Sequence, residues 1–169
     1  MIESNATKKY KIGMYGGKFM PFHKGHLHCI EYAAKQCEKL YVLLFYGSDQ
    51  EIEILKSRNE NWLQPEYRLE HIKKACEKFE NVFVYSVNVT DCKDKFGKED
   101  WDKETHLVLD ICGKLDAVYG SETEYKDYYD RAYPNAIYEI IDIDRNKCPI
   151  SGTAIRNMKS DEERKKWML

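Results

Sequence analysis

No run of apolar residues in this 169-residue sequence approaches the ~18 that a membrane-spanning helix needs. The first ten residues, MIESNATKKY, also lack the apolar core of a signal peptide. These absences argue against membrane insertion and secretion, so we expect a cytoplasmic protein with no membrane partner.

Paired cysteines and an excess of one charge are missing as well. None of the six cysteines belongs to a Cys-x-x-Cys pair, which argues against a zinc site or a disulfide framework and for free thiols in a reducing compartment. The 27 basic and 29 acidic residues leave a net charge of −2, so the chain has no general attraction for nucleic acid.

What the sequence does contain is an alternation of short apolar runs and longer amphipathic segments. Strands are predicted at residues 10–15, 40–46, 82–87, 117–119 and 136–143. Helices are predicted at residues 26–39, after Pro65, at about 100–114 and from about 161 to the end. Two polar stretches, 47–64 and 88–98, are expected to be mobile loops over a binding crevice.

This alternation predicts one α/β domain over residues 1–169, with a C-terminal helical segment at about 151–169. We expect a doubly wound parallel sheet of about five strands with helices on both faces. The binding crevice of such a sheet lies at the carboxyl ends of its strands, where the strand order reverses.

The stretch from Gly16 to His26, GGKFMPFHKGH, lies between the first predicted strand and the first predicted helix. Its two histidines, His23 and His26, are one helical turn apart at a helix start, where free backbone N–H groups and the helix dipole favour phosphate. On spacing alone, the alternative is a pair of surface histidines on a turn. Three glycines would let a ligand approach the backbone closely. They are Gly16, Gly17 and Gly25.

A second segment, ISGTAIR at residues 150–156, follows the last apolar run. Ser151 is a favoured N-cap, Thr153 adds a hydroxyl to the first turn, and Arg156 follows one turn later. Taken alone, this segment is more simply read as an ordinary capped helix. Two anion-binding helix starts in one chain, each after a strand, indicate one bound triphosphate.

These two motifs resemble those of a nucleotidyltransferase superfamily with (His/Thr)-x-Gly-His and Ile-Ser-x-Thr-x-Ile-Arg signatures. The form Gly-Lys-Phe-x-Pro-x-His-x-Gly-His is most similar to the nicotinamide-mononucleotide adenylyltransferase domain of NadR-like proteins. The resemblance extends over nearly the whole chain, through Tyr67-Arg68-Leu69, Gly120-Ser121-Glu122 and Asp142-Ile143-Asp144-Arg145. It implies a Rossmann-like fold.

The resemblance implies attack of a mononucleotide phosphate on the α-phosphorus of ATP, with release of pyrophosphate. Such a reaction needs alignment and charge neutralisation more than a protein nucleophile. We expect His23 and His26 to donate to the α- and β-phosphates, with Lys18 as a mobile positive charge near them. Magnesium is expected on the phosphates, held by substrate oxygens and water, with no metal ligand from protein side chains.

Further contacts follow from the same motifs. Nucleotide and phosphate contacts are expected from Gly16, Gly17, Phe19, Gly25, Ser121, Ser151, Thr153 and Arg156. Acceptor contacts are expected from Arg68, Trp101, Asp142 and Arg145. The structural alternatives are a solvated Lys18, a salt-bridged Arg68, a core or lid Trp101, and an Asp142 and Arg145 that pair with each other.

Other functions remain open at this point. A related nucleotidyltransferase would transfer AMP or CMP to pantetheine phosphate, FMN or glycerol phosphate. A nucleotide-sensing module would bind ATP without turnover, although intact histidine and Ser-x-Thr motifs argue against that reading. The amide and acid forms of the mononucleotide differ by one charge, and both stay alternatives as the acceptor. Related enzymes are often multimeric, so a homo-oligomer is a further alternative.

Overall fold

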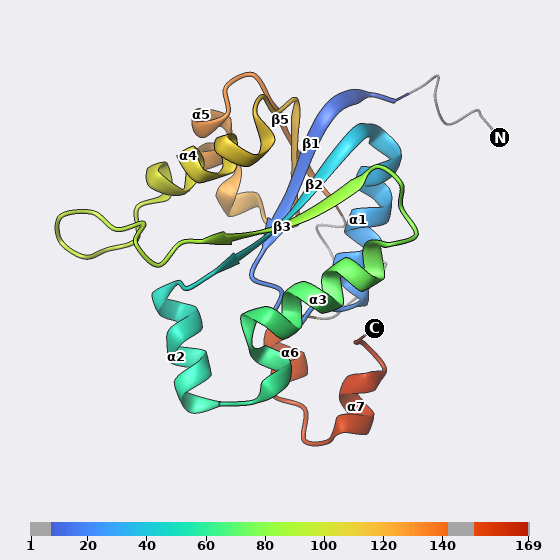
Figure 1. Cartoon of the computed structure of the whole chain (residues 1–169), viewed down its shortest axis with the longest axis vertical. Coiled ribbons are helices and arrows are strands. Elements are labelled where there is room, and N and C mark those ends of the chain that lie inside the picture. Colours follow the sequence, from blue (N-terminus) through green and yellow to red (C-terminus); the bar gives the residue numbers. More distant parts are fainter. Residues whose placement is uncertain (1–7, 142–150, 169) are drawn as a thin grey trace.

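The computed structural model describes residues 8–141 and 151–168, and its centre is a five-stranded sheet (Figure 1). The strands are β1 (Tyr10–Gly17), β2 (Cys37–Tyr46), β3 (Val82–Asn88), β4 (Ala117–Gly120) and β5 (Ile137–Ile140). Their order across the sheet is β3-β2-β1-β4-β5, and every neighbouring pair is parallel. The predicted parallel sheet is therefore confirmed.

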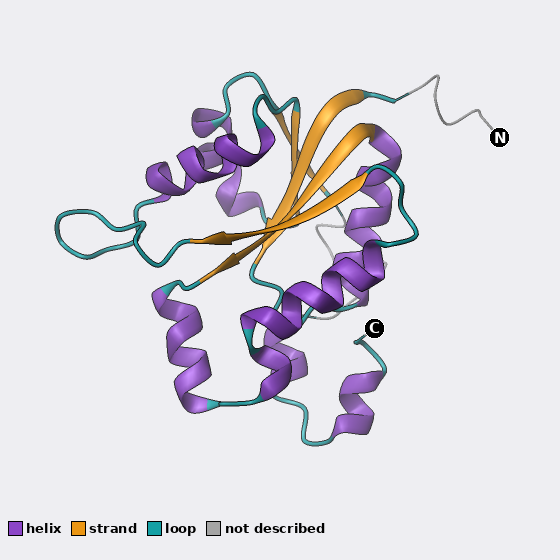
Figure 2. Cartoon of the chain, viewed as in Figure 1, coloured by secondary structure: helices purple, strands orange, loops and turns teal. Residues whose placement is uncertain are grey.

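Helices cover both faces of this sheet (Figure 2). The α-helices are α1 (Lys24–Gln36), α2 (Asp49–Ser57), α3 (Pro65–Cys76), α4 (Trp101–Cys112), α5 (Lys126–Ala132), α6 (Gly152–Arg156) and α7 (Asp161–Lys165). Two short 3-10 helices, η2 (Asn61–Leu63) and η3 (Thr123–Tyr125), precede α3 and α5. Buried residues of α1 and α3 share one hydrophobic cluster with the sheet, and buried residues of α4 share a second with Tyr133 and Tyr138. Helices therefore pack on both faces of the parallel sheet, which is the Rossmann-like, doubly wound arrangement.

The strand order reverses between β1 and β4. The chain builds β1, β2 and β3 outward in one direction, then returns to place β4 on the other side of β1. Crossover loops leave in opposite directions at such a point, which opens a crevice at the carboxyl ends of the two strands. The end of β1 also carries the glycines that precede the histidine motif.

The first helix begins earlier than the pattern predicts. We expected residues 26–39, but α1 starts at Lys24 because His23 caps it, and it ends at Gln36. Cys37 is extended and fully buried, so β2 starts there, three residues before the predicted boundary. The result places His23 at the N-cap of the helix and His26 in its first turn.

The expectation of an irregular loop over residues 47–64 is wrong. Ser48 accepts a hydrogen bond from the backbone N–H of Glu51 at 3.2 Å and caps α2, which occupies half of this stretch. The residue that α2 buries is a glutamate rather than one of its apolar residues. Helix α5 was also not predicted. Within the part of the chain described here, no helix combines the length and apolar character needed to cross a bilayer.

Candidate active site

Two histidines lie at the start of α1, with His23 as its N-cap and His26 in its first turn. His23 Nδ1 accepts the backbone N–H of Gly25 at 3.1 Å, and His26 Nδ1 accepts the backbone N–H of His23 at 3.2 Å. The two rings stack with their centroids 3.7 Å apart. Because each Nδ1 is an acceptor, the proton of each neutral ring lies on Nε2. The turn thus fixes two imidazole N–H donors beside the N-terminal N–H groups of the helix.

The loop before this helix has an unusual backbone. Phe19 has φ of 52°, a left-handed conformation that residues other than glycine seldom adopt. Its ring is buried and packs edge-on against the His26 ring, with centroids 4.7 Å apart. We expected Phe19 to contact the nucleotide, and the structure shows it buried beneath His26.

Two arginines bind the carbonyl groups on either side of Phe19. Arg68 Nη1 donates to the Lys18 carbonyl at 2.6 Å, and Arg156 Nη1 donates to the Met20 carbonyl at 2.6 Å. Uncommon backbone conformations persist where surrounding contacts determine them, and these two bonds do so here. The arginines thereby fix the path of the loop that carries Lys18 to the histidines.

Arg68 itself is fully engaged inside the protein. Its Nη2 forms an ion pair with Glu51 at 2.8 Å, and its Nε donates to the Leu63 carbonyl at 2.9 Å. Both side chains of the pair are buried, at 1% and 2% exposed. This arrangement corresponds to the salt-bridged alternative for Arg68, which joins α2, η2 and the Lys18 loop.

The second motif contacts the loop of the first motif, although Arg156 and Met20, which meet there, are 136 positions apart in the sequence. Ser151 caps α6 by accepting the Ala154 N–H at 3.1 Å, and Arg156 Nη2 donates to Thr153 Oγ1 at 3.2 Å. A Cβ on Gly152 would lie 2.8 Å from the Met20 carbonyl oxygen, so glycine permits this close approach. The start of α6 is thus packed directly against the Phe19 loop.

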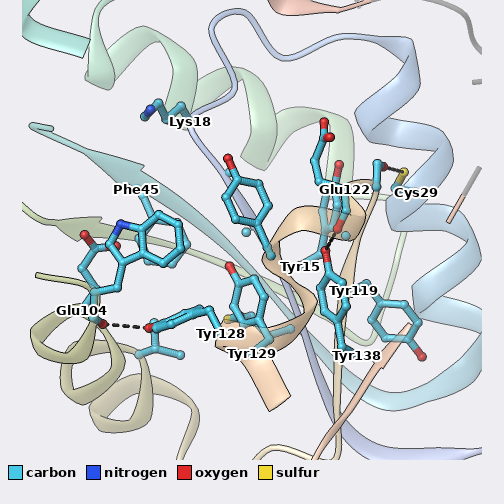
Figure 3. A pocket seen from close by; sticks show the side chains of 18 of the residues that line it. Tyr15, Lys18, Cys29, Phe45, Glu104, Tyr119, Glu122, Tyr128, Tyr129 and Tyr138 are labelled. Carbon is cyan, nitrogen blue, oxygen red and sulfur yellow. Dashed lines mark hydrogen bonds between the residues drawn. The ribbon is translucent and has the colours of Figure 1, made fainter. Parts of the chain in front are cut away.

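A cavity of about 400 Å³ opens at the carboxyl ends of β1 and β4 (Figure 3). Eight of the residues expected in the site line it, so the glycines and histidines of the first motif share one cavity with Trp101. They are Gly16, Gly17, Lys18, His23, Gly25, His26, Trp101 and Ser121. Phe19, Arg68, Ser151, Thr153 and Arg156 lie outside its lining. The expected sites Asp142 and Arg145 fall outside the described residues.

An aromatic wall lies along α4, η3 and α5. Trp101 is 37% exposed and packs against Tyr125 and Tyr128, with ring centroids 5.5 and 4.9 Å away. Tyr129 and Tyr138 stack nearly parallel, 5.1 Å apart, and both also line the cavity. Figure 3 shows Lys18 well apart from Tyr128, Tyr129 and Tyr138. Such a wall suits a flat ring that stacks against it.

Three glutamates, Glu99, Glu104 and Glu122, line the cavity together with Lys18. Burial lowers the pKa of Lys18, although Glu99 and other carboxylates oppose this shift, and its ammonium donates to the Gln50 side chain. Burial, a hydrogen bond with Glu99 and repulsion from Glu99 raise the pKa of Glu104 to about 8. The described residues include no cluster of three His, Cys, Asp or Glu side chains that could hold a metal ion.

Sequence reasoning missed several lining residues. Glu104 lies three positions after Trp101 on α4. This spacing places both residues on one face of the helix and could have indicated that both line the cavity. Tyr125 and Tyr128 gave no such signal, because the chain has 13 tyrosines and η3 and α5 were not predicted.

The geometry agrees with what sequence comparison finds. A family model described as cytidylyltransferase-like matches residues 14–158. Phosphopantetheine adenylyltransferase from Mycoplasma capricolum subsp. capricolum is 29% identical over 152 residues, which cover 88% of this chain and 96% of that protein. Phosphopantetheine adenylyltransferase from Streptococcus pneumoniae (strain Taiwan19F-14) is 27% identical over 140 residues, covering 77% and 71%.

Solved structures of similar fold carry different descriptions. A NadR protein in complex with NAD and AMP-PNP superposes with a TM-score of 0.63 at 25% identity, over 89% of this chain. A bifunctional NMN adenylyltransferase/ADP ribose pyrophosphatase from Francisella tularensis superposes with a TM-score of 0.64 at 21% identity, over 94% of this chain, and shows the fold alone. The chain spans less than half the length of each, 43% and 45%.

Proposed function

This chain belongs to the cytidylyltransferase-like family of nucleotidyltransferases, and we propose that it transfers AMP from ATP to the phosphate of nicotinamide mononucleotide, giving NAD and pyrophosphate. An oxygen of the acceptor phosphate forms the new bond to the α-phosphorus. The bond from that phosphorus to the bridging oxygen breaks, and pyrophosphate leaves with the electron pair.

The histidine turn supplies what this step needs. In our proposal, the Nε2–H groups of His23 and His26 donate to the α- and β-phosphates, where negative charge builds up in the transition state. Their Nδ1 atoms are already held by backbone N–H groups, so the rings need no reorientation as the reaction proceeds. Preorganised donors of this kind are worth a factor on the order of 100 to 1,000 in rate each.

Positive charge would come from two sides. Lys18 lines the cavity, where we propose that it contacts the triphosphate or the incoming phosphate. Ser151, Thr153 and Arg156 would bind the β- and γ-phosphates at the start of α6. Arg156 binds Met20 and Thr153 through one N–H of each terminal nitrogen, and its guanidinium has further N–H groups for a ligand.

The aromatic wall is the observation that carries the choice of acceptor. A cavity with paired histidines and glycines at one end has Trp101, Tyr125 and Tyr128 at another. A nicotinamide ring would stack on Trp101 while its phosphate reaches the histidines. The NadR protein solved with NAD and AMP-PNP supports this assignment, because its fold and 25% of its aligned residues are shared.

We propose that ATP enters as its magnesium complex, whose ion would neutralise part of the phosphate charge. Phosphate oxygens and water would be its main ligands, as is usual for magnesium bound with a nucleotide. In this proposal Asp142 and Arg145 remain acceptor contacts.

Phosphopantetheine is the second candidate acceptor. The observation that favours it is the 29% identity to a phosphopantetheine adenylyltransferase over 88% of this chain. Its flexible, non-aromatic arm gains less from a tryptophan and tyrosine wall than a flat ring does, which is why we place it second.

An acceptor panel tests the proposal. Purified protein with ATP and magnesium would receive nicotinamide mononucleotide, phosphopantetheine, FMN or glycerol phosphate, with pyrophosphate release as the readout. We expect the fastest release with nicotinamide mononucleotide. Faster release with another acceptor would contradict the acceptor assignment, and no release with any of them would favour a nucleotide-sensing module.

A further inference from the structure

Strand β3 forms one edge of the sheet, and its sequence does nothing to protect that edge. The strand order ends with β3 on one side and β5 on the other. β5 has only four residues and contains Glu139, and short edge strands with charged side chains resist pairing with another chain. β3 has seven residues, VFVYSVN, with no charged residue and no proline. By this criterion β3 is the edge that can accept a further strand.

Hydrogen bonds at its two ends show which backbone groups of β3 face outward. The Asn81 carbonyl accepts the Leu40 N–H at 2.8 Å, and the Val89 N–H donates to the Tyr46 carbonyl at 2.8 Å. In a parallel pair, alternate residues bond to the same neighbour, so the odd-numbered residues from 81 to 89 face β2. The even-numbered residues present their N–H and C=O groups at the outer edge. They are Val82, Val84, Ser86 and Asn88. Among the described residues, no strand pairs with this edge.

Apolar side chains flank the same edge on both faces of the sheet. On one face, Phe83 and Tyr85 are 39% and 45% exposed, and the Tyr41 ring lies 6.2 and 6.0 Å from theirs. On the other face, Val82 and Val84 pack against the hydrophobic cluster that α3 shares with the sheet. A groove of about 330 Å³ opens beside them, lined by residues of α3 and β3. Exposed apolar surface that gathers in one place is typical of an interface.

The groove also carries two opposite charges. Lys73 on α3 and Glu77 at its C-terminal end are one helical turn apart, and both line the groove. Neither forms an ion pair within the described part of the chain. A two-fold axis at β3 would turn α3 of a second copy antiparallel to α3 of the first, so each Lys73 would face the other copy's Glu77. Such self-complementarity fits a second copy of this chain better than an unrelated strand.

We propose that β3 pairs antiparallel with β3 of a second copy, joining the two sheets into one across a two-fold axis beside Tyr85. With the axis there, Val84 of each copy pairs with Ser86 of the other, and Val82 pairs with Asn88. All outward backbone groups of the strand then find partners, and the aromatic side chains at the edge are covered. The lining of the candidate active site contains no residue of β3, so this interface is separate from the proposed reaction.

Sedimentation velocity over a range of protein concentrations tests the proposal. We expect the wild type at twice the 20.0 kDa of one chain. Tyr85→Lys and Tyr85→Glu each set like charges opposite one another at the axis, so each variant alone should have half the wild-type mass. An equimolar mixture of the two variants sets opposite charges there and should restore the dimer.

Ser86→Pro provides a second disruption and serves if the Tyr85 variants fail to fold. Proline removes an N–H that faces the partner and leaves the bonds to β2 in place, so this variant should also be monomeric. Phe96→Lys is the control, because Phe96 is 77% exposed but lies outside β3 and the groove, and it should keep the wild-type mass. Circular dichroism would verify that each variant is folded.

Hydrogen exchange of single backbone amides locates the interface. The amides of Val84 and Ser86 should exchange at least about tenfold faster in Tyr85→Lys than in the wild type, because only the partner strand protects them. The amides of Phe83 and Val87, which face β2, should keep their protection. A monomeric wild type would overturn the inference. A dimer that survives both Tyr85→Lys and Ser86→Pro, or unchanged exchange at Val84 and Ser86, would overturn it as well.

Discussion

His23 and His26 serve the helix and the cavity with different atoms of the same rings. Their Nδ1 atoms accept backbone N–H groups and close a reciprocal cap on α1. Histidine is an uncommon cap compared with serine, threonine, asparagine or aspartate. Its use here couples the orientation of each ring to the folding of the helix, so the Nε2 donors are fixed before a ligand arrives.

Replacing His26 with alanine should lower kcat for pyrophosphate release by a factor on the order of 100 to 1,000, as for the loss of one preorganised donor. Steady-state kinetics with saturating ATP would measure this. His28→Ala is the matched control, because His28 lies on the same helix but outside the cavity lining, and it should stay within about twofold of the wild type. An unchanged rate in His26→Ala would contradict the assigned role.

Glu104 should make stability depend on pH. Its pKa rises from 4.5 to about 8 on folding, chiefly through burial. Between these values the folded protein retains a proton that the unfolded chain has lost, so stability falls as pH rises through this window. Thermal melts at pH 5, 7 and 9 should show the Tm of Glu104→Gln gaining on the wild type as pH increases. A gap between the two proteins that stays constant with pH would rule out this shift.

Sequence reasoning succeeded at residues whose role depends on the local chain. The two histidines at a helix start and the Ser151 cap both follow from neighbouring residues. For Arg68 it offered a salt bridge only as an alternative and could not name the partners, Glu51 17 positions earlier and the Lys18 carbonyl 50 positions earlier. Contacts of that kind leave no periodic pattern in the sequence.

At the scale of elements, the buried Arg68–Glu51 pair joins α2 and α3 to the Lys18 loop. The pair explains why α2 is a helix that buries a glutamate rather than an apolar residue. Its loss would leave an uncompensated buried charge, and it would also weaken the contacts that fix Lys18 and Phe19.

Glu51→Gln should therefore reduce the free energy of unfolding by about 3 kcal/mol, the scale of removing one partner from a buried pair. Urea denaturation would measure this loss. Because the pair only positions Lys18, kcat should also fall, while the KM for ATP changes less. Glu53→Gln is the control, since its side chain is 76% exposed on the same helix. A stable, fully active Glu51→Gln protein would refute this role.

At the scale of the whole molecule, the fold was predictable because the hydrophobic pattern and the position of the motifs both indicate a parallel α/β sheet. Apolar strands alternate with amphipathic helices, and the β1–α1 junction carries the glycines and histidines at the reversal of strand order. The cavity wall was less predictable, because η3 and α5 are short and rich in tyrosine. Their packing against Trp101 comes from the tertiary fold rather than from local pattern.

The whole site also depends on contact between distant parts of the chain. Arg156 and Gly152 meet the Met20 carbonyl, which joins the C-terminal motif to the loop before α1. The histidines at the start of α1 and the hydroxyl groups of α6 are thus parts of one structure. A single nucleotide could contact both motifs only because this loop lies between them.

A one-pot competition tests the central claim most directly. Equal concentrations of nicotinamide mononucleotide and phosphopantetheine would compete for limiting ATP in the presence of magnesium. The adenylylated products would be separated and quantified by mass spectrometry. The product ratio equals the ratio of kcat/KM values. We predict that NAD is the dominant product, because a flat ring can stack on Trp101; dephospho-coenzyme A as the dominant product would contradict the account.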